Sequence, residues 1–275
     1  VELKTLEDEL AAHQLPQDVR AWLNDAPRDA NPMAILRTAV SMLSESDPQA
    51  DDNSAAANLS KAIRMQALIP QIVTTYYRLS QGLEPVAADP ELGLARDFLY
   101  MMRGERPDDY VGRMFDACLI MHADHELNAS TFAVRQTVST LSDLYSAIVS
   151  GIGTLKGPSH GGANTAVMKM LLEIGEPDRL DSWIHAALES KHKIMGFGHR
   201  VYKTEDPRAT HLREYSRELG ERSGVTKWYE MSRRIEQIML DEKGLHCNVD
   251  FYSASTYYLM GIPVEFFTTV FAFSR

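Results

Sequence analysis

Four short segments of the sequence concentrate the side chains that could carry out chemistry. They contain HADHELN, GPSHGGAN, GFGHRVYKTEDPRA and HCNVDFYSAS, and they fall in the irregular regions 122–128, 151–164, 193–208 and 244–253. Together they offer histidines, one carboxylate with apolar neighbours and several arginines. A carboxylate can remove a proton from carbon if a hydrogen-bond donor stabilises the enolate as it forms, and arginines can hold a di-acid. This set therefore predicts enolate chemistry on an anionic substrate.

In the first segment, His122 and His125 lie near two carboxylates, which suggests a zinc site. However, the spacing is not HExxH, and the sequence nearby holds no Cys or His group to complete a tetrahedral set, so we expect no metal. The alternative, a metal-dependent hydrolase that uses His122 and His125, predicts bound zinc. Asp124 and Glu126 suit helix capping, whereas His125 and Asn128 could donate hydrogen bonds to an anionic ligand.

In the second segment, glycines on both sides of His160 allow the backbone to approach a ligand closely. A helix is expected to begin near this histidine. Its N-terminus would keep the imidazole neutral, so that the ring donates a hydrogen bond instead of carrying charge. The alternative is a capping histidine in a glycine-rich turn.

The third segment places Gly196 and Gly198 before His199, and three cations follow: Arg200, Lys203 and Arg208. Arg208 comes after a proline at a predicted helix start, where the macrodipole disfavours a cation unless an anion pairs with it. Arginine matches a carboxylate through two parallel hydrogen bonds, and lysine suits a phosphate. A solvated basic loop is the alternative, but it leaves the two glycines unexplained.

The fourth segment places Asp250 among apolar and aromatic neighbours, where partial burial would make it a better base. Taken alone, it is more readily an N-cap of the following helix, because aspartate is a favoured cap. Taken with the two neutral histidines, it completes a set of one base, one donor to an enolate oxygen and one group that polarises an acceptor carbonyl.

The remaining chain shows helical periodicity almost everywhere, which predicts an all-α protein. Asn31-Pro32 is a helix start, and a long helix is expected over 55–81 with Pro70 inside it. Residues 129–150 are small and apolar, so we expect this helix to be buried in a core or in a subunit interface. Further helices are expected from near His160 to Gly175 and over 178–192, 207–223 and 226–243.

The composition bounds the class of protein. The chain has 275 residues, of which 24% are charged and 44% hydrophobic, with a formal net charge of −10. These values are typical of a soluble globular protein and argue against nucleic-acid binding. Two distant cysteines indicate free thiols, and no apolar run is long enough for a bilayer. We expect a cytoplasmic or organelle-matrix protein that binds neither nucleic acid nor membrane, and its abrupt ends lead us to expect part of a longer chain.

The segments HADHELNASTF, GPSHGGAN, GFGHRVYKTEDPRA, NVDFYSA and the terminal FAFSR closely resemble the citrate synthase family, of the bacterial type, in order and in spacing. The resemblance runs from His122 to Arg275. It implies the all-α, two-domain citrate synthase fold, truncated at both ends. The large domain would comprise 1–161 and 263–275, and the small domain, 162–262, would close by a hinge to exclude water during enolisation.

The resemblance also implies a reaction and a role for each matching residue. The family condenses acetyl-CoA with oxaloacetate in the tricarboxylic acid cycle and hydrolyses citryl-CoA to citrate and CoA without a metal. The catalytic residues would be Asp250 as the base, His160 as the donor to the thioester oxygen and His199 as the group that polarises the oxaloacetate carbonyl. The oxaloacetate ligands would be His125, Arg208 and Arg275, with Asn128 beside the substrate. Coenzyme A, the carrier of a substrate and not a resident cofactor, would contact Lys203 and the backbone of Met195, Gly196 and Gly198.

Two other functions fit the sequence. A 2-methylcitrate synthase shares these motifs but uses propionyl-CoA, and one methylene changes selectivity by only about 1 to 3 kcal/mol. A non-catalytic helical assembly fragment is the second alternative. A homodimer or higher homo-oligomer is expected, because the helix over 129–149 resembles the dimer-interface helices of the citrate synthase family.

Overall fold

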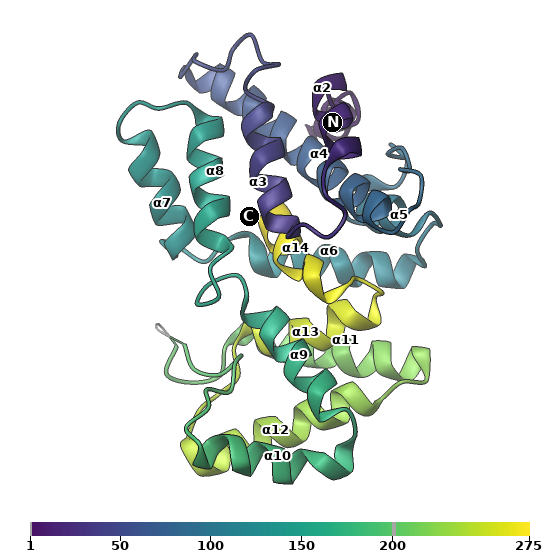
Figure 1. Ribbon diagram of the computed structural model, residues 1–275, viewed down its shortest axis with the longest axis vertical. Coiled ribbons are helices and arrows are strands. Elements are labelled where there is room, and N and C mark those ends of the chain that lie inside the picture. The colour runs from purple at the N-terminus through teal and green to yellow at the C-terminus, as the bar shows by residue number, and fades with distance from the viewer. Residues whose placement is uncertain (1, 200–201) are drawn as a thin grey trace. The chain divides into compact units, whose positions relative to one another are not determined.

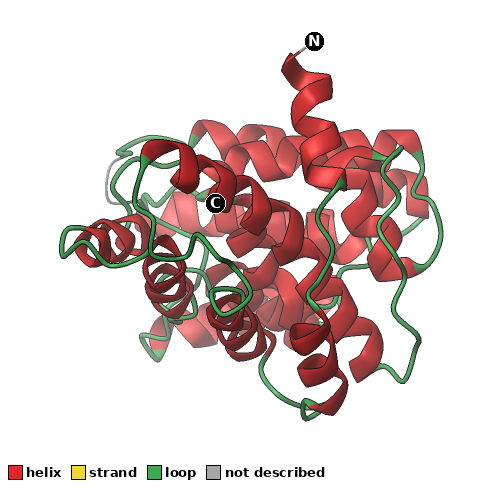
Figure 2. Ribbon diagram, turned by 90° about the horizontal axis from the view of Figure 1, so that it is seen from above, coloured by secondary structure: helices red, strands yellow, loops and turns green. Residues whose placement is uncertain are grey.

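The computed structural model describes residues 2–199 and 202–275, and every regular element within them is a helix (Figure 2). The predicted all-α class is therefore confirmed. The chain divides into two compact units, one formed by 1–157 with 269–275 and the other by 158–268. The expected domain boundaries, at 161/162 and 262/263, differ from this division by a few residues. None of the helices in the described ranges combines the length and apolar character that a bilayer crossing requires.

The first unit holds eight helices and most of a ninth (Figure 1). They are α1 (Glu2–Ala11), α2 (Gln17–Asp25), α3 (Pro32–Met42), α4 (Ala55–Ser80), α5 (Gly93–Arg103), α6 (Asp109–Ala123), α7 (Ala129–Val138), α8 (Leu144–Leu155) and α14 (Phe267–Ser274). The helix start predicted at Asn31-Pro32 is confirmed, since the Asn31 side chain accepts hydrogen bonds from the backbone N–H groups of Met33 and Ala34 at 3.1 and 3.2 Å. The long helix α4 runs through Pro70.

An aromatic stack joins distant parts of the first unit. The ring of Phe98 on α5 lies 5.4 Å from that of Phe115 on α6 and 5.3 Å from that of Phe273 on α14. All three rings are buried, so α14 completes a core that α4, α5 and α6 begin. The terminal FAFSR motif is thereby anchored in this unit.

The single buried helix expected over 129–150 is wrong. The chain breaks there into α7 and α8, because Leu141 takes a left-handed backbone with φ 64° and Asp143 caps α8 by accepting from the N–H of Ser146 at 2.9 Å. The two helices approach closely, since a Cβ on Gly151 would lie 2.6 Å from Cγ2 of Val134. Only Ser130 of α7 is buried in this chain, so a core position for that part of the segment is excluded.

The second unit holds α9 (Ala163–Ile174), α10 (Pro177–Glu189), α11 (Pro207–Ser223), α12 (Lys227–Lys243), α13 (Val249–Leu259) and the 3-10 helix η1 (Val264–Phe266) (Figure 1). The helices predicted over 178–192, 207–223 and 226–243 correspond to α10, α11 and α12. The centre of the unit is α13, which packs against both α9 and α11 and is buried from Val249 to Tyr257 apart from Asp250. A helix held on nearly every side fixes where its first turn lies.

Candidate active site

Two of the four predicted segments are joined by backbone pairing in the second unit. Phe197 and Cys247 form an isolated antiparallel bridge. Beside it, the N–H of Gly198 donates to the carbonyl of His246 and the N–H of Asn248 donates to the carbonyl of Gly196, each at 2.9 Å. The Asn248 side chain adds a bond to the Gly198 carbonyl at 3.0 Å. The loop that carries His199 is thereby tied to the loop that leads into Asp250.

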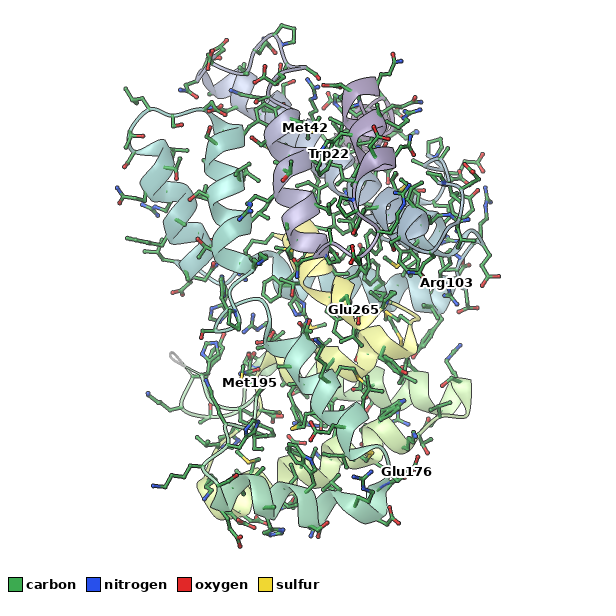
Figure 3. The ribbon with its side chains drawn as sticks, in the orientation of Figure 1. Trp22, Met42, Arg103, Glu176, Met195 and Glu265 are labelled. Carbon is green, nitrogen blue, oxygen red and sulfur yellow. The ribbon has the colours of Figure 1, made fainter. Side chains whose placement is uncertain are left out.

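Gly196 sits where this pairing meets two helices. Its φ of 84° is left-handed, and an added Cβ would lie 2.9 Å from Cβ of Phe251 on α13 and 2.9 Å from Cγ2 of Val167 on α9. Only glycine satisfies both the backbone angle and the space. Three segments therefore meet at Gly196: α9, which follows His160; the loop that leads to His199; and α13, which carries Asp250. Met195, its neighbour, lies on the same loop (Figure 3).

Asp250 is the second residue of α13, and it is not the N-cap. The cap is Asn248, whose side-chain oxygen accepts a hydrogen bond from the Asp250 N–H at 3.0 Å. The capping role that the sequence favoured for Asp250 taken alone is wrong, because asparagine two positions earlier fills it. The Asp250 side chain is half-buried, whereas the rest of the first turn of α13 is buried.

The ring of His199 is oriented by its own loop. The backbone N–H of Tyr202 donates a hydrogen bond to Nδ1 of His199 at 3.1 Å. The two aromatic rings lie 4.6 Å apart at 35°. Since Nδ1 accepts, the ring is neutral and its proton is on Nε2. A neutral ring with its proton on Nε2 can donate a hydrogen bond, and Tyr202 is a contributor that the sequence did not reveal.

His160 lies in a turn that enters α9. The helix begins at Ala163, three residues later than expected, and Gly162 takes the N-cap position. The last residue of the unit in sequence, Thr268, stabilises this turn, since its hydroxyl donates to the carbonyl of Gly161 at 3.0 Å. His160 is half-buried there.

Arg208 has an anionic partner in its own helix cap. Asp206 caps α11 by accepting from the Arg208 N–H at 3.0 Å, and it also accepts from Nε and Nη2 of the Arg208 guanidinium at 3.0 and 2.8 Å. Burial disfavours the charged form of Asp206, but the hydrogen bonds and the charge of Arg208 outweigh it, so the pKa of Asp206 is lowered. The cation at this helix start thus has a partner without any ligand.

A half-buried ionic cluster adjoins the bridge. Oε1 of Glu236 on α12 accepts from Arg213 of α11 at 2.5 Å and from the Cys247 thiol at 3.3 Å, and Oε2 accepts from the Tyr252 hydroxyl at 2.5 Å. Glu205 pairs with the same Arg213. In the described part of the chain, Glu205, Glu236 and Cys247 are the group whose spacing could hold a metal. Arg213 already supplies the positive charge there, so the cluster reads as a support for α11, α12 and α13.

In the first unit, the HADHELN and FAFSR motifs share an aromatic ring. His122 is buried on α6 and lies 4.8 Å from the Phe271 ring, while the Arg275 guanidinium lies 4.5 Å from the centroid of the same ring. Nδ1 of His122 donates to the carbonyl of Cys118 at 2.8 Å. His122 therefore reads as a core residue, whereas His125 is half-buried beyond the end of α6.

Asn128 has a local structural role. It is the N-cap of α7, and its side-chain oxygen accepts from the Thr131 N–H at 3.1 Å and from the Ser130 hydroxyl at 2.8 Å. The sequence assigned capping to Asp124 and Glu126 instead; Asp124 accepts from the N–H of Glu126 at 2.9 Å within the turn. Among the remaining predicted residues, Lys203 is exposed, and Arg200 lies outside the described residues.

Comparisons with known proteins identify the family. The sequence matches the family described as citrate synthase, C-terminal domain, over residues 1–275. It is 51% identical to citrate synthase 2 of Bacillus subtilis over 276 residues, covering 100% of this chain and 74% of that protein. A 2-methylcitrate synthase of Mycobacterium tuberculosis is 41% identical over 267 residues, covering 97% of this chain and 67% of that protein.

A solved structure gives the same result in three dimensions. The citrate synthase of Thermoplasma acidophilum, in ternary complex with carboxymethyl coenzyme A and oxaloacetate, superposes with a TM-score of 0.91 at 30% identity, covering 100% of this chain and 74% of that one. An all-α fold with this pairing of loops and these relatives defines an acyltransferase. The chain belongs to the citrate synthase family.

Proposed function

We propose that this protein condenses acetyl-CoA with oxaloacetate and hydrolyses the resulting citryl-CoA to citrate and CoA. The observation that carries the proposal is the hydrogen bond from the Tyr202 N–H to Nδ1 of His199. It leaves a proton on Nε2 of a neutral ring, where it can be given to an oxygen that becomes negative during carbon–carbon bond formation.

The reaction follows from three side chains of the second unit. Asp250 removes a proton from the methyl group of acetyl-CoA while His160 donates a hydrogen bond to the thioester oxygen, which stabilises the enol. The methyl carbon attacks the keto carbon of oxaloacetate. The carbonyl electrons move to its oxygen, and that oxygen takes the proton from Nε2 of His199. Water then attacks the thioester carbon, the carbon–sulfur bond breaks, and a proton from the water passes to the sulfur, so that CoA leaves as the thiol. The proton taken by Asp250 goes to solvent, and His199 regains one from solvent.

Binding roles are assigned on charge and on the family resemblance. We assign Arg208, Arg275 and His125 to oxaloacetate, because each can donate hydrogen bonds to a carboxylate. Asn128 is kept as a weaker neighbour of the substrate, since its side chain already caps α7. Coenzyme A is assigned to the exposed Lys203 and to the backbone of Met195, Gly196 and Gly198. No step requires a metal ion.

Propionyl-CoA is the alternative acyl substrate, and the 41% identity to a 2-methylcitrate synthase favours testing it. Acetyl-CoA is the first choice because citrate synthase 2 of Bacillus subtilis is 51% identical. The test compares kcat/KM for the two thioesters with the purified full-length protein. A higher value for propionyl-CoA would contradict the choice of acetyl-CoA and leave the condensation itself intact.

Replacing Asp250 by asparagine tests whether the protein is an enzyme at all. Loss of a general base typically lowers the rate by about 10² to 10⁴-fold, whereas Asn248 keeps the helix capped. Turnover that survives Asp250→Asn would contradict the mechanism and favour a non-catalytic assembly role.

We also propose a homodimer built on α7. Apolar side chains are exposed on this helix and on its flanking turns, with Phe132 57% and Leu141 83% exposed. Such a cluster on a helix with almost no buried residues is typical of a subunit interface. A cytoplasmic location is proposed too, supported by the two buried free cysteines, Cys118 and Cys247. The division into a large domain, 1–161 with 263–275, and a closing small domain, 162–262, is kept as a further proposal.

A further inference from the structure

The carboxylate of Asp206 serves two helices at once. It is 1% exposed and stands at the N-cap of α11. Its Oδ2 also accepts a hydrogen bond from the backbone N–H of Val249, the first residue of α13, at 3.2 Å. One side chain therefore satisfies N–H groups at the starts of α11 and α13, where helix dipoles favour a negative charge.

The same carboxylate fixes the orientation of Arg208. Oδ1 accepts from Nε and Oδ2 accepts from Nη2 of the guanidinium, at 3.0 and 2.8 Å. This two-point pairing uses the side edge of the guanidinium plane. A substrate carboxylate that pairs bidentately with Arg208 must therefore approach the end edge, between Nη1 and Nη2.

The hydrogen bond from the Val249 N–H links the carboxylate that orients Arg208 to the helix turn that holds the catalytic base. Val249 immediately precedes Asp250, whose own N–H is held by Asn248 at 3.0 Å. Side chains thus hold two successive N–H groups of the first turn of α13. Asp206 lies at the junction of the segments that carry the anion ligand, the base and the carbonyl-polarising histidine.

We propose that Asp206 is a positioning residue that couples the guanidinium of Arg208 to the first turn of α13, so that the keto acid and the base Asp250 are placed by one carboxylate. The inference rests on the proposed function. Attracting the substrate is not the role of Asp206, because its charge opposes that of Arg208. Its role is to fix the Arg208 guanidinium and the first turn of α13 relative to each other. Misplacement of a reacting group by about 1 Å can cost on the order of 10²-fold in rate.

The test is Asp206→Asn. Asparagine caps helices as well as aspartate does, so α11 keeps its cap. However, one oxygen becomes an NH₂ group, which cannot accept the bonds from Nη2 of Arg208 and from the Val249 N–H. We expect KM for oxaloacetate to rise and kcat to fall together, with kcat/KM for oxaloacetate lower by about 10 to 100-fold. KM for acetyl-CoA should stay near the wild-type value.

The matched control is Asp108→Asn. Asp108 caps α6 in the first unit and accepts from the N–H groups of Tyr110 and Val111 at 2.8 and 3.4 Å. This change should leave kcat and both KM values unaltered. A purely structural role for Asp206 would lower the melting temperature and the active fraction, and so kcat, without changing KM for oxaloacetate. Unaltered KM for oxaloacetate or unaltered kcat in Asp206→Asn would overturn the coupling.

A second measurement needs no turnover. Hydrogen exchange of the amides over 248–252, followed by mass spectrometry, should be faster in Asp206→Asn than in wild type because Val249 loses its acceptor. If that variant does not fold, Arg208→Lys serves instead, because it removes the two-point pairing that holds the Asp206 carboxylate in place. If Asp206 couples the two groups, the loosened carboxylate should hold the Val249 N–H less well, and exchange at Val249 should again be faster than in wild type. Wild-type exchange at Val249 in the folded variant would overturn the inference. A wild-type protein without turnover would instead refute the proposed function.

Discussion

The backbone N–H of Tyr202 lies 3.1 Å from Nδ1 of His199 and donates a hydrogen bond to it. This contact decides which ring nitrogen carries the proton, because a nitrogen that accepts cannot also donate. The proton on Nε2 is the one available to a substrate oxygen. The tautomer is thus set by the main chain of the loop itself, three residues downstream.

The tautomer makes the position of the donor testable. In His199→Gln the side-chain amide nitrogen reaches the position of Nε2, whereas in His199→Asn it reaches only the position of Nδ1. Loss of one such donor typically costs about 10² to 10³-fold in kcat. We expect a loss of that size in kcat for the asparagine variant. For the glutamine variant we expect kcat to fall by only about tenfold. Equal kcat values for the two variants would contradict donation from Nε2.

Gly196→Ala should damage both stability and turnover. The new Cβ would lie 2.9 Å from Cβ of Phe251, and alanine would have to adopt φ 84°. We expect about 1 to 3 kcal/mol less free energy of unfolding and a lower kcat, because Phe251 adjoins Asp250. The matched control is Gly224→Ala, at φ 71° with nothing within 4 Å of the added Cβ. It should lose only about 1 kcal/mol in chemical denaturation and keep its kcat.

Phe132→Asp tests the proposed dimer. The Phe132 side chain is exposed on α7, so a carboxylate in its place would be buried when two copies associate. Burying a charge without a partner raises the free energy of association. Sedimentation should show a larger fraction of monomer than in wild type at equal concentration. Leu59→Asp, at a 63% exposed position of α4, is the control and should leave the mass unchanged. A variant at position 132 that sediments like wild type would refute an interface on α7.

Asp97 makes the stability of the first unit depend on pH. Burial raises the pKa of this carboxyl, which accepts a hydrogen bond from the Asp89 N–H at 2.7 Å, to about 6. Since the unfolded chain has the lower pKa, near 4, the folded state binds more protons between about pH 4 and 6, and the free energy of unfolding falls as pH rises through that range. Above pH 6 the destabilisation is complete.

Asp97→Asn removes this titration and keeps an oxygen for the Asp89 N–H. We expect the variant to be more stable than wild type by about 1 to 2 kcal/mol at pH 7.5 and similar to it at pH 4, measured by urea denaturation. Asp116→Asn, at an exposed position of α6, controls for the loss of one negative charge. A gain for Asp97→Asn of the same size at both pH values would contradict a raised pKa.

Most of the fold could be read from periodicity and from stop and start residues. Asn31-Pro32 begins α3, and the predicted ranges of α11 and α12 agree with the structure to within a residue. The prediction of helix ends failed where close packing between helices explains a glycine that the local pattern assigns to a loop. Gly151 and Gly153 suggested the end of a helix, yet both lie inside α8, and at Gly151 the absence of a side chain admits Val134 of α7.

The sequence by itself determined the chemistry on offer, because residue type and spacing identify a base, neutral imidazoles and arginines without reference to distance. It also determined most of the helices, since periodicity is a local property. Only the tertiary structure decided what each polar group does. Asn248 and not Asp250 caps α13, Asp206 pairs with both Arg208 and Val249, and Tyr202 sets the tautomer of His199. The bond between Asp206 and Val249 joins residues 43 positions apart, and a one-dimensional pattern does not show which distant segments meet. The other contacts are local, but they depend on the backbone conformation that packing imposes on each loop.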